Sequence, residues 1–240
     1  MSKLKITPSI IPNLFTALNM FSGFLSIIYS SNSNFVYAGW LIIVAAIFDT
    51  LDGLMARLTK SSSELGVELD SLSDVVSFGA APSFLLYKTY FFNFDTAGII
   101  LSSLPLIAGG FRLARFNVQL VGFDKKYFTG LPIPSAAIFF STFILSFYQN
   151  GFNKIFEFTI IPSVIFISYL MVSKVRYETI PKFSYENFKS KPLHFMFIFL
   201  SFLAVIIFYV KGLFFSFVAM ITIGFIRHYY LKFFHKTTRG

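Results

Sequence analysis

The chain has 240 residues, of which 55% are hydrophobic and 13% are charged, and its mean hydropathy is +0.71. This composition excludes an ordinary soluble domain and indicates an integral membrane protein. The net charge of +9 is carried by residues between and beyond the apolar runs, which favours anionic lipid headgroups over nucleic acid as the partner.

Apolar segments long enough to cross a bilayer, ~20 residues each, number about eight. They cover Ile10–Ser30, Phe35–Leu58, Leu72–Phe92, Ala97–Phe116, Leu131–Gln149, Phe156–Ser173, Leu193–Val210 and Leu213–Leu231. The first is too long for a cleaved signal core and is expected to stay as a membrane segment. We expect residues 1–240 to form one all-α, polytopic helical bundle of about eight transmembrane helices.

The distribution of lysine and arginine predicts the orientation. If the N-terminus is cytoplasmic, 17 of the 20 basic residues fall on that side, and the other side holds Lys88, Lys154 and Lys211. Such a bias predicts that both termini and the loop between the second and third segments face the cytoplasm. The expected location is the cell membrane.

The second segment runs into "FDTLDGLMARLTKSSSELGVELDSLSD", residues 48–74, which holds four of the six aspartates of the chain. On helices, Asp49 and Asp52 share one face, and Asp70 and Asp74 share another. Because the link between the helices is short, the two pairs are expected to converge. Carboxylates inside a membrane bundle usually have a function, so a solvated loop is the weaker interpretation.

Four converging carboxylates repel one another, and two divalent cations would balance their charge. Oxygen ligands, with neither histidine nor cysteine nearby, favour Mg²⁺, Mn²⁺ or Ca²⁺ over zinc. Two such ions typically hold a phosphoryl group during displacement. The pattern therefore predicts phosphoryl transfer.

Small residues accompany the aspartates. Gly53, Ala56 and Gly66 leave space for a substrate to approach the backbone, and Arg57 is placed to meet phosphate oxygens. Close packing of helices is the alternative explanation for such small residues.

Together these residues fit D-x2-D-G-x2-A-R-x8-G-x3-D-x3-D, which resembles the signature of the CDP-alcohol phosphatidyltransferase family at every spacing. The positions are Asp49, Asp52, Gly53, Ala56, Arg57, Gly66, Asp70 and Asp74. The resemblance implies an all-helical membrane enzyme, usually a homodimer. It would move a phosphatidyl group from a CDP-linked lipid to an alcohol and release CMP by a two-metal-assisted displacement.

The resemblance also implies roles for individual residues. All four aspartates would hold two Mg²⁺ or Mn²⁺ ions, and Asp74 would also take the proton from the attacking hydroxyl. The CDP pocket would be lined by Asp52, Gly53, Ala56, Arg57 and Gly66 and, through the early stretch "PNLFT", by Asn13 and Thr16.

The acceptor alcohol is suggested by other stretches. "LDSLSDVVSFGAAPS", "FRLARFN" and "FTGLPIPSAA" resemble the phosphatidylserine synthase branch, which implies CDP-diacylglycerol and L-serine as substrates. Arg112 and Arg115 are three residues apart and would fit the serine carboxylate, with lipid phosphate as the alternative partner. Ser77 and Asn117 could bind the substrate through hydrogen bonds or satisfy backbone groups within the bundle.

Several other functions are also compatible with the sequence. The same chemistry could use glycerol phosphate or inositol phosphate as acceptor, or an ether-linked archaeal lipid as donor. An intramembrane prenyltransferase would need a second aspartate-rich motif, and only Asp95 and Asp124 follow Asp74. A cation transporter would use the same carboxylates as an ion path but would leave Gly53, Arg57 and the x8 spacing unexplained.

Overall fold

The computed structural model describes residues 10–59, 61, 63–119, 127–149, 151–178 and 192–237. Its elements in chain order are α1 (Ile10–Ser31), α2 (Phe35–Thr59), α3 (Glu64–Asp74), the π-helix η1 (Val75–Ala80), α4 (Ala81–Thr89), the 3₁₀-helix η2 (Phe91–Phe94), α5 (Asp95–Gln119), β1 (Tyr127–Thr129), α6 (Ile133–Phe147), α7 (Lys154–Val172), β2 (Arg176–Glu178) and α9 (Pro192–Thr237).

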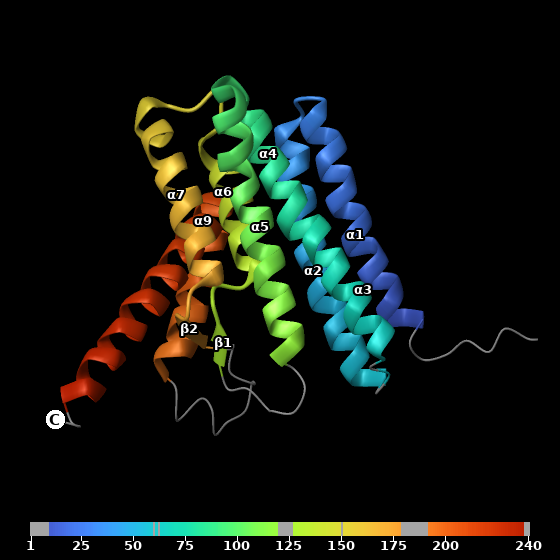
Figure 1. Cartoon of the computed structure of the whole chain (residues 1–240), viewed down its shortest axis with the longest axis vertical. Coiled ribbons are helices and arrows are strands. Elements are labelled where there is room, and N and C mark those ends of the chain that lie inside the picture. Colours follow the sequence, from blue (N-terminus) through green and yellow to red (C-terminus); the bar gives the residue numbers. More distant parts are fainter. Residues whose placement is uncertain are drawn as a thin grey trace, which may run out of the picture.

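The helices stand side by side in a bundle, and the start of α1 and the end of α9 lie at the same end of it (Figure 1). The strands β1 and β2 pair antiparallel in a short ribbon at that end, with Phe128 opposite Tyr177. We call this the ribbon end of the bundle. The lysines at positions 3, 5, 60, 125, 126, 182, 189 and 191, which were predicted to face the cytoplasm, lie outside the described residues.

Within the described residues, four helical segments are long and apolar enough to cross a membrane. They are Ile10–Ser31, Phe91–Val118, Lys154–Val172 and Pro192–Phe233. The predicted all-α membrane protein is therefore confirmed.

The predicted number of eight helices is not confirmed, because the described residues form seven helical rods when α9 is counted as one. However, α9 consists of two helices that meet at a kink at Tyr209, whose φ is 51° and ψ is −125°. The predicted break between the last two segments, at Lys211 and Gly212, comes directly after this kink. The last two predicted segments therefore correspond to the two parts of α9.

The third predicted segment also begins earlier than expected, at Glu64 instead of Leu72. Ser63 caps this helix, because its side-chain oxygen accepts a hydrogen bond from the backbone N–H of Gly66 at 3.1 Å. From there α3, η1 and α4 form one continuous rod as far as Thr89. π-helical turns are rare in proteins, and those that occur inside a longer helix are often found at functional sites. Here the π-helix η1 follows Asp74 directly.

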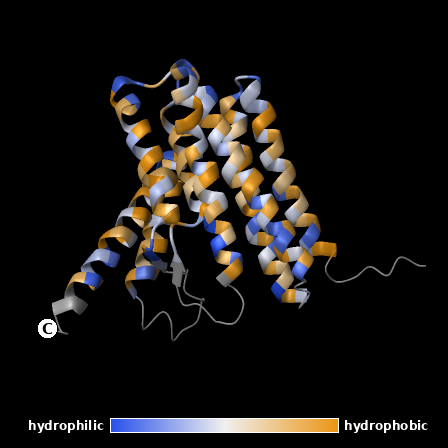
Figure 2. Ribbon diagram, viewed as in Figure 1, coloured by the Kyte–Doolittle hydropathy of each residue, from blue (hydrophilic) through white to orange (hydrophobic). Residues whose placement is uncertain are grey.

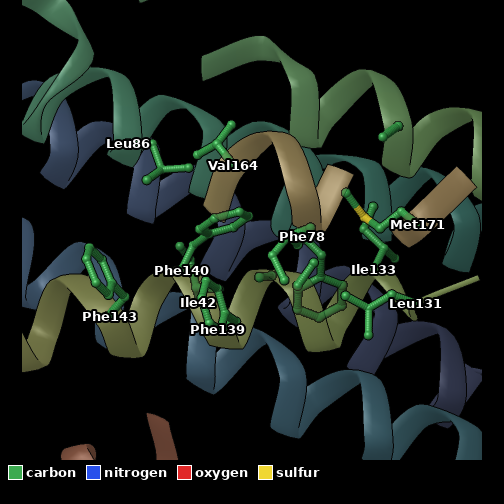
Figure 3. Packing of buried hydrophobic residues seen from close by; sticks show 14 of the residues in the cluster. Ile42, Phe78, Leu86, Leu131, Ile133, Phe139, Phe140, Phe143, Val164 and Met171 are labelled. Atoms are coloured by element: carbon green, nitrogen blue, oxygen red, sulfur yellow. The ribbon is translucent and has the colours of Figure 1, made fainter. Parts of the chain in front are cut away.

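The apolar core lies between α2, α4, α5, α6 and α7. Figure 3 shows Phe78, Phe140 and Val164 packed together with residues of the neighbouring helices, and each of the three is at most 1% exposed. Hydrophilic residues gather instead near the ribbon end of α2, α3 and α5 (Figure 2). The bundle therefore has a dry middle and a polar region at one end.

The face of α1 that packs inside the bundle consists mainly of small and polar side chains. Its buried residues are Pro12, Thr16, Asn19, Ser22, Gly23, Ser26 and Ser30. They recur every three or four positions and so share one side of the helix. Small side chains allow neighbouring helices to approach closely, as they commonly do in membranes. This stripe brings α1 against α2 and against the α3–η1 rod.

Gly23 is the position at which the approach is tightest. A Cβ atom added there would lie 2.5 Å from Cα of Ser77. Gly23→Ala should therefore push α1 away from η1 and lower the free energy of unfolding by about 1–3 kcal/mol, the usual cost of overpacking. Thermal unfolding of the purified protein in detergent would measure the effect.

The matched control is Gly110→Ala in α5, because a Cβ atom at Gly110 meets nothing within 4 Å. Alanine is the better helix former, so this change should leave stability equal or raise it by up to about 1 kcal/mol. Equal thermal midpoints for the two variants would contradict the tight α1–η1 contact.

Candidate active site

Three carboxyl groups meet between α2 and α3 near the ribbon end. Asp49 comes from α2, and Asp70 and Asp74 come from α3, and one oxygen of each lies within 4.8 Å of the others. Asp74 is buried, and the other two are half-buried. Oxygen Oδ1 of Asp70 is buried and has no hydrogen-bond partner among the described residues. Three oxygen ligands so close together fit a hard divalent cation, which would offset their mutual repulsion.

Asp52, the fourth predicted metal ligand, lies beside this group and not within it. The hydroxyl of Thr16 donates a hydrogen bond to Oδ2 of Asp52 at 3.0 Å. Asp52 is only 7% exposed and still repels the charge of Asp70, so it belongs to the same electrostatic site. The role of Asp52 as a metal ligand stays a prediction.

The α1 helix is tied to the rod that carries the aspartates. Ser73 donates to the backbone carbonyl of Thr16 at 3.1 Å, and Ser77 donates to that of Asn19 at 2.8 Å. The amide nitrogen of Asn19 lies 3.5 Å from Oδ1 of Asp74. Ser77, predicted to bind serine, is therefore engaged with α1 in this structure.

Asn19 was not among the predicted site residues. The signal that could have found it is its position on α1, three residues after Thr16 on the face where polar residues recur. A polar side chain buried in a membrane helix usually serves a site.

The small residues of the motif border an open region. A Cβ atom at Gly53 would come no closer than 4.0 Å to another side chain, that of Arg57, and Arg57 itself is exposed. Ala56 is half-buried one position before Arg57. The structure leaves room here for a ligand phosphate to reach the guanidinium.

Gly66 lies against the beginning of α1. A Cβ atom at Gly66 would lie 3.5 Å from Oδ1 of Asn13 and 3.1 Å from Oγ of Ser63. The structure thus brings together two predicted CDP-pocket residues, Asn13 and Gly66, that are 53 positions apart. Their contact with a nucleotide stays a prediction.

Arg112 of α5 is buried, at 6% exposed, and its guanidinium lies 6.0 Å from the ring centre of Phe116. The charge of Asp74 acts on it favourably. A pocket of about 270 Å³ is lined by Phe111, Arg112, Arg115 and Val172. Arg112 therefore lines this pocket within electrostatic range of the aspartate site.

Arg115 has a different environment, although it is only one turn away. Its guanidinium donates to the carbonyl oxygens of Val172 and Thr129, each at 2.9 Å. It also reaches those of Met171 and Ser173, at 3.5 and 3.4 Å. These carbonyls belong to the end of α7 and to β1, so Arg115 clamps α5 to both elements. A guanidinium at a helix C-terminus satisfies carbonyls that the helix leaves unpaired.

Asn117 also makes an internal contact, because its amide donates to the hydroxyl of Ser71 at 2.9 Å. This bond joins the end of α5 to α3 beside Asp70. Among the four residues predicted to bind serine, Arg112 is the one that both lines the pocket and is attracted by the charge of Asp74.

Comparison with known proteins agrees with this geometry. The family model described as CDP-alcohol phosphatidyltransferase matches residues 9–171 and so includes every aspartate of the site. The chain belongs to the CDP-alcohol phosphatidyltransferase family. It is accordingly a membrane-bound transferase of phospholipid synthesis, which acts on a CDP-alcohol donor and an alcohol acceptor.

Several curated relatives share most of this length. A protein of Helicobacter pylori named CDP-diacylglycerol–serine O-phosphatidyltransferase is 41% identical over 176 residues, which cover 71% of this chain and 73% of the relative. An archaetidylserine synthase of Methanothermobacter thermautotrophicus is 40% identical over 183 residues, 75% of each chain. A Bacillus subtilis protein with the same name as the first is 34% identical over 75% of this chain and 96% of its own length.

The carboxylate group predicts metal dependence that one substitution can test. Asp70→Asn keeps the shape of the side chain but removes a charge, so it should weaken Mn²⁺ binding and lower the rate of CMP release by more than about 100-fold. That exceeds the loss typical of residues that only orient a ligand. Calorimetry would measure Mn²⁺ binding, and a CMP assay would measure the rate.

Asp95→Asn is the matched control, because it makes the same chemical change at the first residue of α5, away from the ribbon end. It should leave both readouts unchanged. Normal Mn²⁺ binding and normal CMP release by Asp70→Asn would contradict the assignment of the metal site.

Proposed function

We propose that this protein transfers the phosphatidyl group of CDP-diacylglycerol to the hydroxyl of L-serine, giving phosphatidylserine and CMP. The observation that carries the proposal is the 41% identity to the Helicobacter pylori serine O-phosphatidyltransferase over 176 residues, which cover 71% of this chain. The family model covers the whole aspartate site. The meeting of Asp49, Asp70 and Asp74 in one place supports the same chemistry.

In the proposed reaction, Asp49, Asp52, Asp70 and Asp74 hold two divalent cations, Mg²⁺ or Mn²⁺. Bound there, the cations would neutralise the diphosphate oxygens and make CMP a better leaving group. Asp74 takes the proton of the serine hydroxyl while that oxygen bonds to the lipid phosphorus and the bond from phosphorus to the CMP oxygen breaks. Burial of Asp74 keeps water away from this step.

The CDP moiety would occupy the open region beside Gly53, Ala56 and Arg57, with Arg57 directed at its phosphates. Asn13 and Gly66 would close that region from the side of α1, where the structure places them in contact distance of each other. The acyl chains remain in the bilayer, beside the exposed apolar surface of the bundle.

The carboxylate of serine would bind Arg112. A buried guanidinium is a strong ligand for a carboxylate, because it offers two parallel donors in a dry environment. The pocket of about 270 Å³ that Arg112 lines supports this placement, and so does the electrostatic attraction between Arg112 and the proposed base, Asp74.

The proposal includes a topology. Both termini and the active site would face the cytoplasm of the cell membrane, where serine and CMP are soluble. Arg57 and Arg115 lie near the ribbon end, whereas Lys88 ends α4 and Lys154 begins α7 at the opposite end of the bundle. This asymmetry favours a cytoplasmic ribbon end. A homodimer is expected from the family resemblance.

An assay with a panel of acceptors tests the function. Purified protein with CDP-diacylglycerol and Mn²⁺ or Mg²⁺ should form phosphatidylserine and CMP with L-serine, and no lipid product with glycerol phosphate or inositol phosphate. The archaetidylserine synthase relative makes an ether-linked CDP-lipid a second donor to compare. A product formed only with one of the phosphorylated acceptors would overturn the serine assignment.

The two arginines of α5 should respond differently to substitution. Arg112→Ala should raise the KM for serine by more than about 10-fold, as expected for a lost charged hydrogen bond, and leave the KM for CDP-diacylglycerol nearly unchanged. Arg115→Ala should instead lower the thermal midpoint, because four carbonyl oxygens lose their donor. A serine KM raised equally in Arg115→Ala, with normal stability, would contradict this division.

A further inference from the structure

Asn19 lies at the centre of the contact between α1 and the aspartate site. Its side chain is 0% exposed, and its amide nitrogen is 3.5 Å from Oδ1 of Asp74. Its own carbonyl oxygen, Oδ1, is buried and has no hydrogen-bond partner among the residues that the structure describes. Among the described residues, the side chain of Asn19 therefore has one hydrogen-bond partner, Asp74, which is the proposed catalytic base.

The orientation of this amide follows from the proposed role of Asp74. A general base is ionised, so a carbonyl oxygen turned toward it would place two acceptors together, and they would repel each other. The NH₂ group therefore points to Asp74. The donor is also neutral, so it can hold the carboxylate without competing with a cation for its charge.

The backbone around Asn19 is held in place on both sides of Asp74. Ser77 donates to the carbonyl of Asn19 at 2.8 Å, and Ser73 donates to that of Thr16 at 3.1 Å. The two serines lie one residue before and three residues after Asp74. The hydrogen bonds of Ser73 and Ser77 thus hold α1 against the rod, and they position the Asn19 amide next to the Asp74 carboxylate without involving either group.

Packing alone does not explain an asparagine at this position. A buried amide oxygen without a partner is destabilising, whereas leucine has a similar size and would fill the site without that cost. Elsewhere on this face of α1, Ser22 and Ser26 are smaller than asparagine and donate to backbone carbonyl oxygens. The benefit of the amide must therefore lie in its contact with Asp74.

We propose that Asn19 is a positioning residue for Asp74, because it holds the carboxylate on the side of α1 in the orientation that a general base needs. The inference rests on the proposed function and adds a residue that the family signature does not contain. It applies to the base and not to either substrate pocket. Its loss should therefore change turnover and metal affinity more than substrate affinity.

The test compares Asn19→Leu and Asn19→Ala with the wild type, as full-length protein in lipid nanodiscs. Both should lower kcat by about 10–100-fold, the range for residues that orient a metal ligand. The KM values for serine and for CDP-diacylglycerol should change by less than about 3-fold. Calorimetry without substrates should show weaker Mn²⁺ binding. Asn19→Ala cannot overpack the site, so it decides the question if Asn19→Leu does not fold.

Ser26→Ala is the matched control. Ser26 lies on the same face of α1, two turns further from the site, and donates to the carbonyl of Ala38 at 2.9 Å. Its removal should lower thermal stability and leave kcat and Mn²⁺ binding unchanged. A similar loss of kcat in Ser26→Ala would show that α1 acts only by packing and would overturn the inference.

The outcomes also separate this inference from the proposed function. An active wild type with Asn19→Leu and Asn19→Ala within about 3-fold of its kcat would overturn the role of Asn19 alone. A wild type that forms no phosphatidylserine would overturn the serine assignment, while Mn²⁺ binding by the Asn19 variants would still report on the position of Asp74.

Discussion

Repulsion among carboxylates is the constraint on which this structure depends. Asp49, Asp70 and Asp74 lie within 4.8 Å of one another at the edge of an apolar bundle, where charge is poorly screened. The fold meets this constraint with neutral donors from α1, since Thr16 bonds Asp52 and Asn19 contacts Asp74. Because these donors add no charge, the site keeps its negative potential for cations. The site is thus a product of three helices, although its signature lies on only two.

The remaining helices place positive charge around that potential. Arg112 and Arg115 carry the same charge on the same helix, but their side chains have different surroundings. Arg112 is buried and is attracted by the charge of Asp74, whereas Arg115 is occupied by carbonyl oxygens at the end of α7 and in β1. The clamp made by Arg115 holds the end of α5, the helix that carries Arg112, against α7 and β1. The ribbon, remote from the aspartates in sequence, contributes to the site in this indirect way.

The convergence of the aspartates was predictable because helical periodicity and a short link leave little freedom. The segments of the bundle were predictable for the same reason, from length and hydropathy. The break in α9 was predicted within a few residues of Tyr209, where Lys211 and Gly212 interrupt the apolar run. The π-helix after Asp74 was not predictable, because no residue type in the sequence marks it. The clamp of Arg115 was also hidden, since its partners lie up to 58 residues later in the chain. The spacing of Arg112 and Arg115 in the sequence could not distinguish their roles.

The polar stripe of α1 has a consequence for how the protein is made. This helix is synthesised before the residues of other elements that pair with its buried groups, which are Ala38, Asp52, Ser73, Asp74 and Ser77. Thr16 and Ser22 can already donate to carbonyl oxygens within α1, but Asn19 lacks its contacts with Asp74 and Ser77 until residue 77 has left the ribosome. Hydrocarbon penalises unpaired polar groups, so the nascent α1 gains its stability in the membrane only as later helices arrive. The stability of α1 in the membrane therefore depends on the synthesis of the rod formed by α3, η1 and α4.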